Sequence, residues 1–188
     1  MEQEKTTTFS RQISARIRLV AEPDVPNLHK LVSQMANYHG LSHVFTTTET
    51  SLSNTLFKFP PFHSFTALIL EISPNPFPSP DIYVAGHVLV FPSYNGFFEK
   101  PGLYLDQMFV RKCYRGMRLG KLLFSAVALQ DAKMGMGMVD WLVADWNEES
   151  IHLYEKMGAH CIPEYRLCKL YGENCFNTMP TSLLNFNC

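Results

Sequence analysis

The segment Val110–Leu123 reads VRKCYRGMRLGKLL, and it joins a β-rich stretch to a run of residues with helical spacing. It contains five basic residues, two glycines and no acidic residue. The basic residues are Arg111, Lys112, Arg115, Arg118 and Lys121. A helix N-terminus exposes unpaired N–H groups with a partial positive charge, and glycine lets the backbone approach an anion closely. A strand, a basic glycine-containing loop and a helix therefore predict a phosphate-binding site; a solvated basic loop is the alternative.

The segments around this loop alternate between strand and helix patterns. Apolar residues recur at helical spacing in four segments, which we expect to be helices: 24–40, 47–58, 119–134 and 147–158. Runs rich in β-formers predict strands at 15–20, 65–72, 82–91, 103–110 and 139–144, and a closing hairpin at 160–162 and 166–171. This order predicts an α/β fold with one mixed central sheet of six to seven strands, flanked by about four helices.

The composition is that of one globular domain. The chain has 188 residues, of which 46% are hydrophobic and 18% are charged. We expect a flexible arm over residues 1–14, one domain over residues 15–172 and a tail over residues 173–188. The polar start lacks the apolar core of a signal peptide, and no apolar stretch approaches the roughly 20 residues of a membrane span. These features predict a cytoplasmic protein without a membrane partner.

Charge and cysteine content argue against two further classes of site. A net charge of −1 gives the chain as a whole no reason to bind nucleic acid, for which only the basic loop argues. The five cysteines include no C-x-x-C pair and no histidine at ligand spacing. We therefore predict neither a metal site nor a disulfide framework.

The basic loop also carries a family resemblance. Its part YRGMRLGK, Tyr114–Lys121, resembles the acetyl-CoA motif R/Q-x-x-G-x-G/A of GNAT acyltransferases, although Arg118 stands where the motif has its middle glycine. The resemblance implies the GNAT fold, acetyl-CoA or another acyl-CoA as cosubstrate, and a loop that holds the pyrophosphate. The loop residues implied are Arg115, Gly116, Met117, Arg118, Leu119, Gly120 and Lys121. The strand residues Met108, Phe109 and Val110 are implied to pair with the pantetheine amides as an added strand would.

A second stretch, WLVADWNEESIHLYEKMGA at Trp141–Ala159, resembles the next strand and helix of the same family. The resemblance implies that Asn147 contacts the pantetheine arm and that Tyr154 lies beside the thioester sulfur. A tyrosine there can give its proton to the departing thiolate, which makes Tyr154 a candidate catalytic residue. The structural alternatives are a helix N-cap for Asn147 and a core-facing ring for Tyr154.

An acidic residue precedes the proposed cofactor strand. The tripeptide Leu105-Asp106-Gln107 occupies the place where related polyamine acetyltransferases carry two adjacent acids. A carboxylate at Asp106 can hold an ammonium substrate and accept its proton, so Asp106 is a candidate catalytic and substrate-binding residue and Gln107 a substrate-binding one. A sheet-edge aspartate is the alternative. No His/Asp arrangement is evident around Cys113, so direct transfer in a ternary complex is expected rather than an acyl-enzyme.

The N-terminal half narrows the subfamily. Two stretches, YHGLSHVF at Tyr38–Phe45 and LEISPNPF at Leu70–Phe77, resemble two groups of plant enzymes. One comprises diamine and ornithine N-acetyltransferases, themselves similar to spermidine/spermine acetyltransferases, and the other comprises tyramine N-hydroxycinnamoyltransferases. Aromatic rings and neutral imidazoles suit a short or aromatic amine, so Tyr38, His39 and His43 are candidate substrate-binding residues; structural histidines are the alternative.

These observations predict an N-acetyltransferase that acts on a primary amine of a small diamine, ornithine-like or arylalkylamine substrate. A hydroxycinnamoyl-CoA donor with tyramine as acceptor is one alternative. A protein that binds CoA with impaired catalysis, because of Arg118, is another. A homodimer is expected, since members of this family commonly dimerise.

Overall fold

The computed structural model of the chain describes residues 13–169. The predicted C-terminal tail and most of the predicted N-terminal arm lie outside these residues. The chain divides between Leu142 and Val143 into two compact units, which are described in turn.

The first unit is built on a mixed sheet whose strand order follows the sequence. Its strands are β1 (Ser14–Leu19), β2 (Thr66–Ser73), β3 (Tyr83–Asn95), β4 (Lys100–Val110) and β5 (Val139–Trp141). Strands β1 to β4 pair antiparallel with their neighbours, and β5 joins β4 in parallel. The predicted mixed α/β sheet is confirmed, with five strands in the described residues rather than six to seven.

The difference lies in the predicted closing hairpin. Residues 160–169 form no strand, and the side chains over this stretch are exposed. A segment with a strand pattern forms a stable strand only where a partner strand and a buried face are available. Pro163 also removes one N–H donor from this segment. The prediction of strands at 160–162 and 166–169 is therefore wrong, and residues 170 and 171 lie outside the described part.

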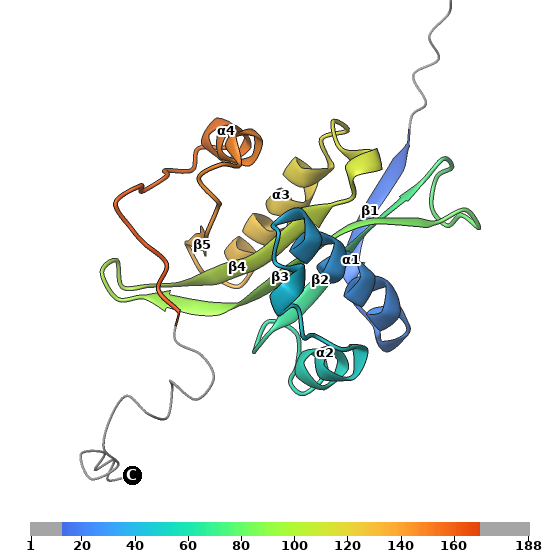
Figure 1. The fold of residues 1–188 in the computed structure, drawn as a ribbon, viewed down its shortest axis with the longest axis horizontal. Helices are drawn as coiled ribbons and strands as arrows, with labels where there is room; N and C mark the ends of the chain where they lie inside the picture. The colour runs from blue at the N-terminus through green and yellow to red at the C-terminus, as the bar shows by residue number, and fades with distance from the viewer. Residues whose placement is uncertain (1–12, 170–188) are drawn as a thin grey trace, which may run out of the picture. The chain divides into compact units, whose positions relative to one another are not determined.

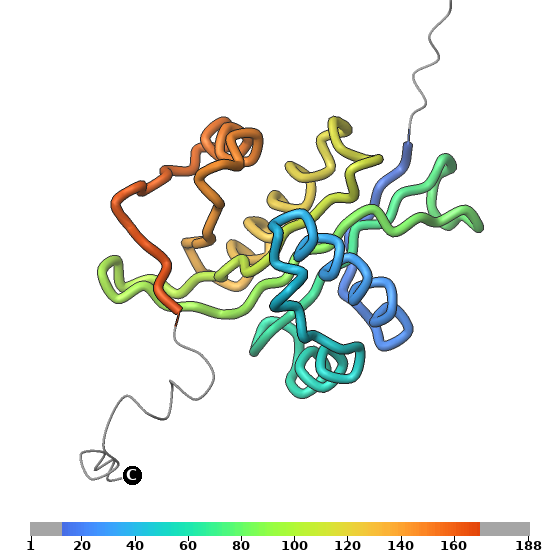
Figure 2. Tube along the Cα trace, in the orientation of Figure 1, coloured from blue at the N-terminus to red at the C-terminus, as the bar shows by residue number. Residues whose placement is uncertain are grey.

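Helices cover both faces of the sheet. Helices α1 (Val25–Tyr38) and α2 (Glu49–Leu56) lie on one face and α3 (Leu119–Lys133) on the other, as Figures 1 and 2 show. The α1–α2 layer packs on the sheet through one cluster of buried residues: Val25, Leu28, Val32, Leu52, Leu56, Ala67 and Leu89. Every residue of β2 is buried, as expected for a central strand covered on both faces.

Local sequence signals fix the helix ends. Pro26 lies in the first turn of α1, where its missing N–H has no helical partner to lose, and Gly40 follows the helix with φ of +70°. Thr48 caps α2 by accepting a hydrogen bond from the Ser51 backbone N–H, and the Ser51 hydroxyl oxygen accepts one from the Thr48 N–H in return.

An ion-pair network joins β1, β2 and the start of α1. Arg18 donates to the carboxylates of both Asp24 and Glu71, each at 2.6 Å, and Arg16 donates to Glu71 at 2.6 Å. Burial alone would raise the pKa of the Glu71 carboxyl, but the arginine hydrogen bonds outweigh burial and hold this pKa below its ordinary value. The hydrogen bond from Arg18 likewise lowers the pKa of Asp24. The Asp24 carboxylate accepts from Arg18 and from the Ala21 N–H rather than from the first turn of α1.

The second unit contains one helix, α4 (Glu148–Lys156), within its described residues. The Asn147 side chain caps α4 by accepting from the Ser150 N–H at 3.4 Å, and Gly158 follows the helix with φ of +91°. In the part of the chain that the structure describes, no helix has both the length and the apolar character that a membrane crossing requires.

Candidate active site

A β-bulge in β4 lies at the centre of the candidate site. The register pairs Gln107 with Leu89 and Leu105 with Val90, which leaves Asp106 as the extra residue of β4. A bulge bends its strand and redirects the side chains around it. As a result Asp106 is exposed while Gln107, the next residue, is half-buried on the side of the sheet covered by α1.

Beyond the bulge, one edge of β4 is open. Strand β5 pairs only with Leu103–Leu105, whereas β4 continues to Val110. Among residues 13–169 no strand pairs with the β5 side of Met108, Phe109 and Val110. An open strand edge presents backbone N–H and C=O groups to which an extended ligand can add as a further strand.

The basic loop connects this edge to the N-terminus of α3. A short 3-10 turn (Lys112–Tyr114) is followed by Gly116 with φ of +79° and Arg118 with φ of +60°. Arg118 is the N-cap of the 15-residue helix α3, whose first turn contains Leu119, Gly120 and Lys121. A left-handed conformation favours glycine and costs other residues about 1–2 kcal/mol. Arg118 therefore holds the conformation for which the motif glycine is suited, at an energetic cost.

Arg115 points from the loop toward α1. Its Nε donates to the carbonyl oxygen of Val110 at 3.1 Å, and its guanidinium carbon lies 4.5 Å from the centroid of the Tyr38 ring. The Phe109 ring centroid is 5.7 Å from the same carbon. Distances of this kind are typical of cation–π contacts. The structure thus brings together Arg115, Phe109 and Tyr38, two of which the sequence assigned to cofactor binding and one to substrate binding.

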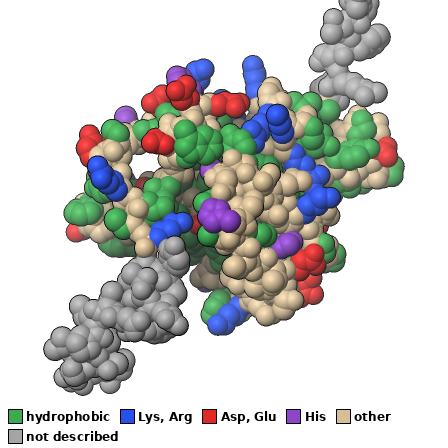
Figure 3. Space-filling model, viewed as in Figure 1, with side chains coloured by type: hydrophobic (Ala, Val, Ile, Leu, Met, Phe, Trp, Pro, Cys, Tyr) green, Lys and Arg blue, Asp and Glu red, His purple; other side chains and the backbone are tan. Residues whose placement is uncertain are grey.

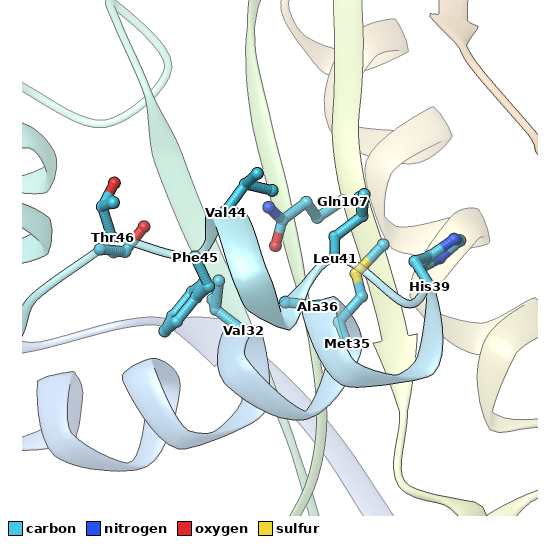
Figure 4. A pocket seen from close by; sticks show the side chains of 10 residues that line it. Val32, Met35, Ala36, His39, Leu41, Val44, Phe45, Thr46 and Gln107 are labelled. Carbon is cyan, nitrogen blue, oxygen red and sulfur yellow. The ribbon is translucent and has the colours of Figure 1, made fainter.

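A pocket of about 230 Å³ opens between α1, the segment that follows it, and β4 (Figure 4). Ten residues line it: Val32, Met35, Ala36, His39, Leu41, Val44, Phe45, Thr46, Thr47 and Gln107. Of the predicted substrate-binding residues, His39 and Gln107 line the pocket, whereas Tyr38, His43 and Asp106 do not. Burial lowers the pKa of His39, which favours its neutral form.

In the space-filling view, imidazoles lie near the centre of the drawn face and Lys and Arg side chains gather at its upper right (Figure 3).

Sequence reasoning missed His87, which lies behind the pocket. This side chain on β3 is fully buried, and its Nε2 is 3.4 Å from Oε1 of Gln107. Burial lowers the pKa of His87 to about 4, so the imidazole is neutral near pH 7. The only signal in the sequence is a histidine within an apolar strand, which does not reveal its partner.

A second polar group lies where β4 meets β5. Tyr104 pairs with Asp140 across the two strands and stacks on Phe91 with ring centroids 5.0 Å apart. Burial, and then the negative charges of Asp106 and Asp140, raise the pKa of the Tyr104 phenol. Asp106 and Asp140 therefore place two negative charges near Tyr104, and such a neighbourhood attracts cations.

In the second unit, Tyr154 on α4 is buried, with 6% of its surface exposed. Burial raises the pKa of its phenol to about 12, so it stays protonated across the physiological range. Asn147 has the N-cap role given above, which is compatible with a further contact to a ligand. Within residues 13–169, no group of three His, Cys, Asp or Glu side chains is placed to hold a metal ion.

The profile of the Acetyltransferase (GNAT) family matches residues 31–159, which is more than half of the chain. The chain belongs to the GNAT acetyltransferase family. It is 40% identical to L-ornithine N5-acetyltransferase NATA1 of Arabidopsis thaliana over 90% of each chain. It is 30% identical to tyramine N-feruloyltransferase 4/11 of Nicotiana tabacum, with 90% of this chain and 92% of the relative covered.

Solved structures share the GNAT fold. An integron cassette protein from the mobile metagenome of V. cholerae superposes with a TM-score of 0.65 at 17% identity, covering 87% of this chain and 96% of the other. The family and its relatives identify the chain as an enzyme that acylates amines, as the sequence predicted.

GNAT acetyltransferases use acetyl-CoA, and three features of the basic loop and of β4 are compatible with this cosubstrate. The positive φ angles at Gly116 and Arg118 turn the loop into the N-terminus of α3, which suits a pyrophosphate. Arg111 at the end of the strand has a buried Nε without a hydrogen-bond partner in the described residues, which an anion could satisfy. The open edge of β4 provides the backbone groups that amides can pair with.

Proposed function

We propose that this enzyme transfers an acetyl group from acetyl-CoA to a primary amine of a small diamine, ornithine-like or arylalkylamine acceptor. The observation that carries the proposal is the bulge in β4, which leaves Asp106 exposed between the pocket-lining Gln107 and Leu105, the last residue of β4 that pairs with β5. A pocket of about 230 Å³ is smaller than those that hold drug-sized ligands, so it suits a short amine. The 40% identity to an ornithine acetyltransferase supports this acceptor class.

The proposed mechanism is direct attack in a ternary complex. The ammonium substrate gives up a proton to Asp106 or to water beside it, and the free amine then attacks the thioester carbonyl. The new C–N bond forms as the C–S bond breaks, the nitrogen gives up its second proton to water, and the departing sulfur takes a proton. We assign that donation to Tyr154, because a phenol with a pKa of about 12 keeps its proton at neutral pH. The proton that the nitrogen releases through water restores the phenol.

The proposed cofactor contacts follow the elements described above. The backbone of Met108, Phe109 and Val110 would pair with the pantetheine amides. The loop from Arg115 to Lys121 would hold the pyrophosphate, and Asn147 would contact the pantetheine arm. Tyr38 and His43 are proposed to border the acceptor, next to the pocket-lining His39 and Gln107.

A second candidate reaction uses a hydroxycinnamoyl-CoA donor and tyramine. Two observations favour it: the 30% identity to a tyramine N-feruloyltransferase, and a pocket lined by apolar and neutral side chains such as Val32 and Phe45. The two reactions share the fold, the cofactor loop and the mechanism, and they differ in the donor.

A panel of donors and amines, with products identified by mass spectrometry, tests both reactions. Acetyl-CoA and feruloyl-CoA are each combined with ornithine, 1,4-diaminobutane and tyramine. Acetylated amine as the main product is the expected result. No product with any pair would overturn both candidates. We further propose a cytoplasmic homodimer, for which light scattering of the purified chain measures the mass.

A further inference from the structure

The pocket beside β4, which we call the acceptor pocket, contains the amide of Gln107, and a hydrogen bond to His87 orients this amide. Figure 4 shows the Gln107 side chain running from β4 toward Val44, with its amide in the space between α1 and the following segment. Residues 13–169 offer this amide one hydrogen bond, the 3.4 Å contact between Oε1 and Nε2 of His87. The amide nitrogen, which carries two N–H donors and no acceptor, is the part of Gln107 left to a ligand.

The hydrogen bond to His87 determines which end of the Gln107 amide faces the pocket. The neutral imidazole has one N–H, and the amide oxygen can only accept, so that N–H lies on Nε2. Nδ1 is then an acceptor, buried without a partner among the described residues. A fully buried imidazole with one long hydrogen bond and one unsatisfied nitrogen opposes folding, which is expected at a functional site more than in a core.

The rest of the pocket lacks a negatively charged group that would neutralise a second cation. None of its ten lining residues is Asp, Glu, Lys or Arg. His39 is the only lining residue with an ionisable side chain, and burial lowers its pKa and so favours its neutral form. An ammonium group placed here would meet uncharged acceptors at most, the Thr46 and Thr47 hydroxyls and the His39 ring, so it would lose hydration without gaining a counter-charge. An uncharged group with a lone pair would accept a hydrogen bond from Gln107.

We propose that Gln107 is the specificity-determining residue of the acceptor pocket, held by His87 as a positioning residue. The pocket therefore selects an amine whose far end is uncharged and carries a hydrogen-bond acceptor, such as the hydroxyl of a hydroxyphenylalkylamine, over an amine with a second ammonium. This inference rests on the proposed function, since it narrows the acceptor class of the same site.

Equilibrium binding in the presence of CoA tests the proposal separately from catalysis. Calorimetry compares tyramine, phenylethylamine (which lacks the hydroxyl) and 1,4-diaminobutane. We expect the full chain to bind tyramine about tenfold or more tightly than either of the others. Gln107→Glu supplies a carboxylate that attracts the second ammonium, so it should shift the tyramine-to-diamine ratio of dissociation constants by at least about tenfold toward the diamine. Gln107→Leu should abolish the difference between tyramine and phenylethylamine.

The His87 variants test the positioning role. His87→Gln keeps an N–H donor near the position of Nε2 and should retain the tyramine preference, whereas His87→Leu should lose it. Matched His63→Gln and His63→Leu, on an exposed turn, control for the substitutions themselves. Because His87 is fully buried, the binding data of His87→Leu are used only if this variant unfolds cooperatively. If it does not, the Gln107 variants alone test the proposal.

The outcomes separate this inference from the proposed function. Unchanged dissociation-constant ratios in both Gln107 variants, or a preference of the full chain for 1,4-diaminobutane, would overturn the inference even with turnover intact. Ratios that change as expected in a chain that acylates none of the amines would uphold the inference and overturn the proposed function.

Discussion

Arg118 shows what a single backbone conformation costs in the basic loop before α3. Its φ of +60° is left-handed, and the chain retains this conformation although the residue is not glycine. Arg118→Gly removes about 1–2 kcal/mol of steric cost from the folded state. Glycine also raises the conformational entropy of the unfolded chain, which offsets part of this gain. We expect a net gain near 1 kcal/mol and a rise in Tm of about 2–4 °C, measured by scanning calorimetry.

The neighbouring Met117 provides the control for this prediction. Met117 has no positive φ, so Met117→Gly should destabilise the chain by about 1 kcal/mol. A lower Tm in Arg118→Gly would show that the arginine side chain stabilises the loop. CoA affinity of the two variants, measured in parallel, tells whether the charge of Arg118 contributes to binding. A large loss of affinity in Arg118→Gly would contradict the idea that this arginine impairs the site.

Tyr154 carries the chemical part of the proposal. If it gives a proton to the departing sulfur, Tyr154→Phe should lower kcat by about 10²-fold or more and leave the dissociation constant for CoA nearly unchanged. Burial raises the pKa of this phenol to about 12, so loss of its proton should not reduce the rate below pH 10. Tyr165→Phe, at a tyrosine that is 73% exposed, is the matched control. A rate reduced less than threefold in Tyr154→Phe would rule out this role.

At the scale of elements, the ion pairs between β1, β2 and the start of α1 stabilise the edge of the sheet. Arg18 forms ion pairs with the carboxylates of Asp24 and Glu71, and Glu71 is 4% exposed. Removing one partner of a buried pair costs roughly 3–5 kcal/mol, but Arg18 is about one-third exposed and Arg16 still serves Glu71. We therefore expect Arg18→Met to lower the free energy of unfolding by about 2 kcal/mol in urea titrations. Lys30→Met, on the exposed side of α1, should change it by less than about 0.5 kcal/mol.

The sequence predicted elements whose signals are local. The helices at residues 24–40, 47–58 and 119–134 and the first four strands carry period and turn signals within a few residues, and each forms close to its predicted bounds. The strand–loop–helix arrangement around Arg115–Lys121 was predicted from the same kind of local signal, and its cofactor role stays a prediction. The strand ends were less accurate, because β3 and β4 extend past their apolar runs as a paired hairpin to Asn95 and Lys100.

Features that depend on long-range pairing could not be predicted. The bulge at Asp106 exists because of the register between β3 and β4, and no local signal marks it. The contact of His87 with Gln107 and that of Arg115 with Tyr38 join residues that are 20 and 77 positions apart in the chain. The failed prediction of a closing hairpin has the same origin, since a strand pattern does not specify a partner.

For the molecule as a whole, these buried groups predict how stability depends on pH. Burial lowers the pKa of His87 to about 4, whereas the unfolded chain titrates this histidine near 6.5. Between these values the unfolded state binds a proton that the folded state does not. Protonation of His87 in the unfolded state therefore does not reduce the free energy of unfolding above pH 6.5. As the pH falls toward 4, it reduces this free energy by up to about 3 kcal/mol. The lowered pKa values of Asp24 and Glu71 add a second loss, which begins as the pH falls below about 5.

Urea titrations at several pH values separate the two losses. The full chain should lose most of the first contribution between pH 6.5 and 4.5, and His87→Gln should flatten this interval because no imidazole is left to protonate there. His63→Gln, at an exposed position, should keep the slope of the unaltered chain. Below pH 4 all three should lose stability together, since Asp24 and Glu71 are unchanged in each. An equal slope between pH 6.5 and 4.5 in the full chain and in His87→Gln would mean that folding does not lower the pKa of His87, and the neutral imidazole with an acceptor at Nδ1 would then lose its basis.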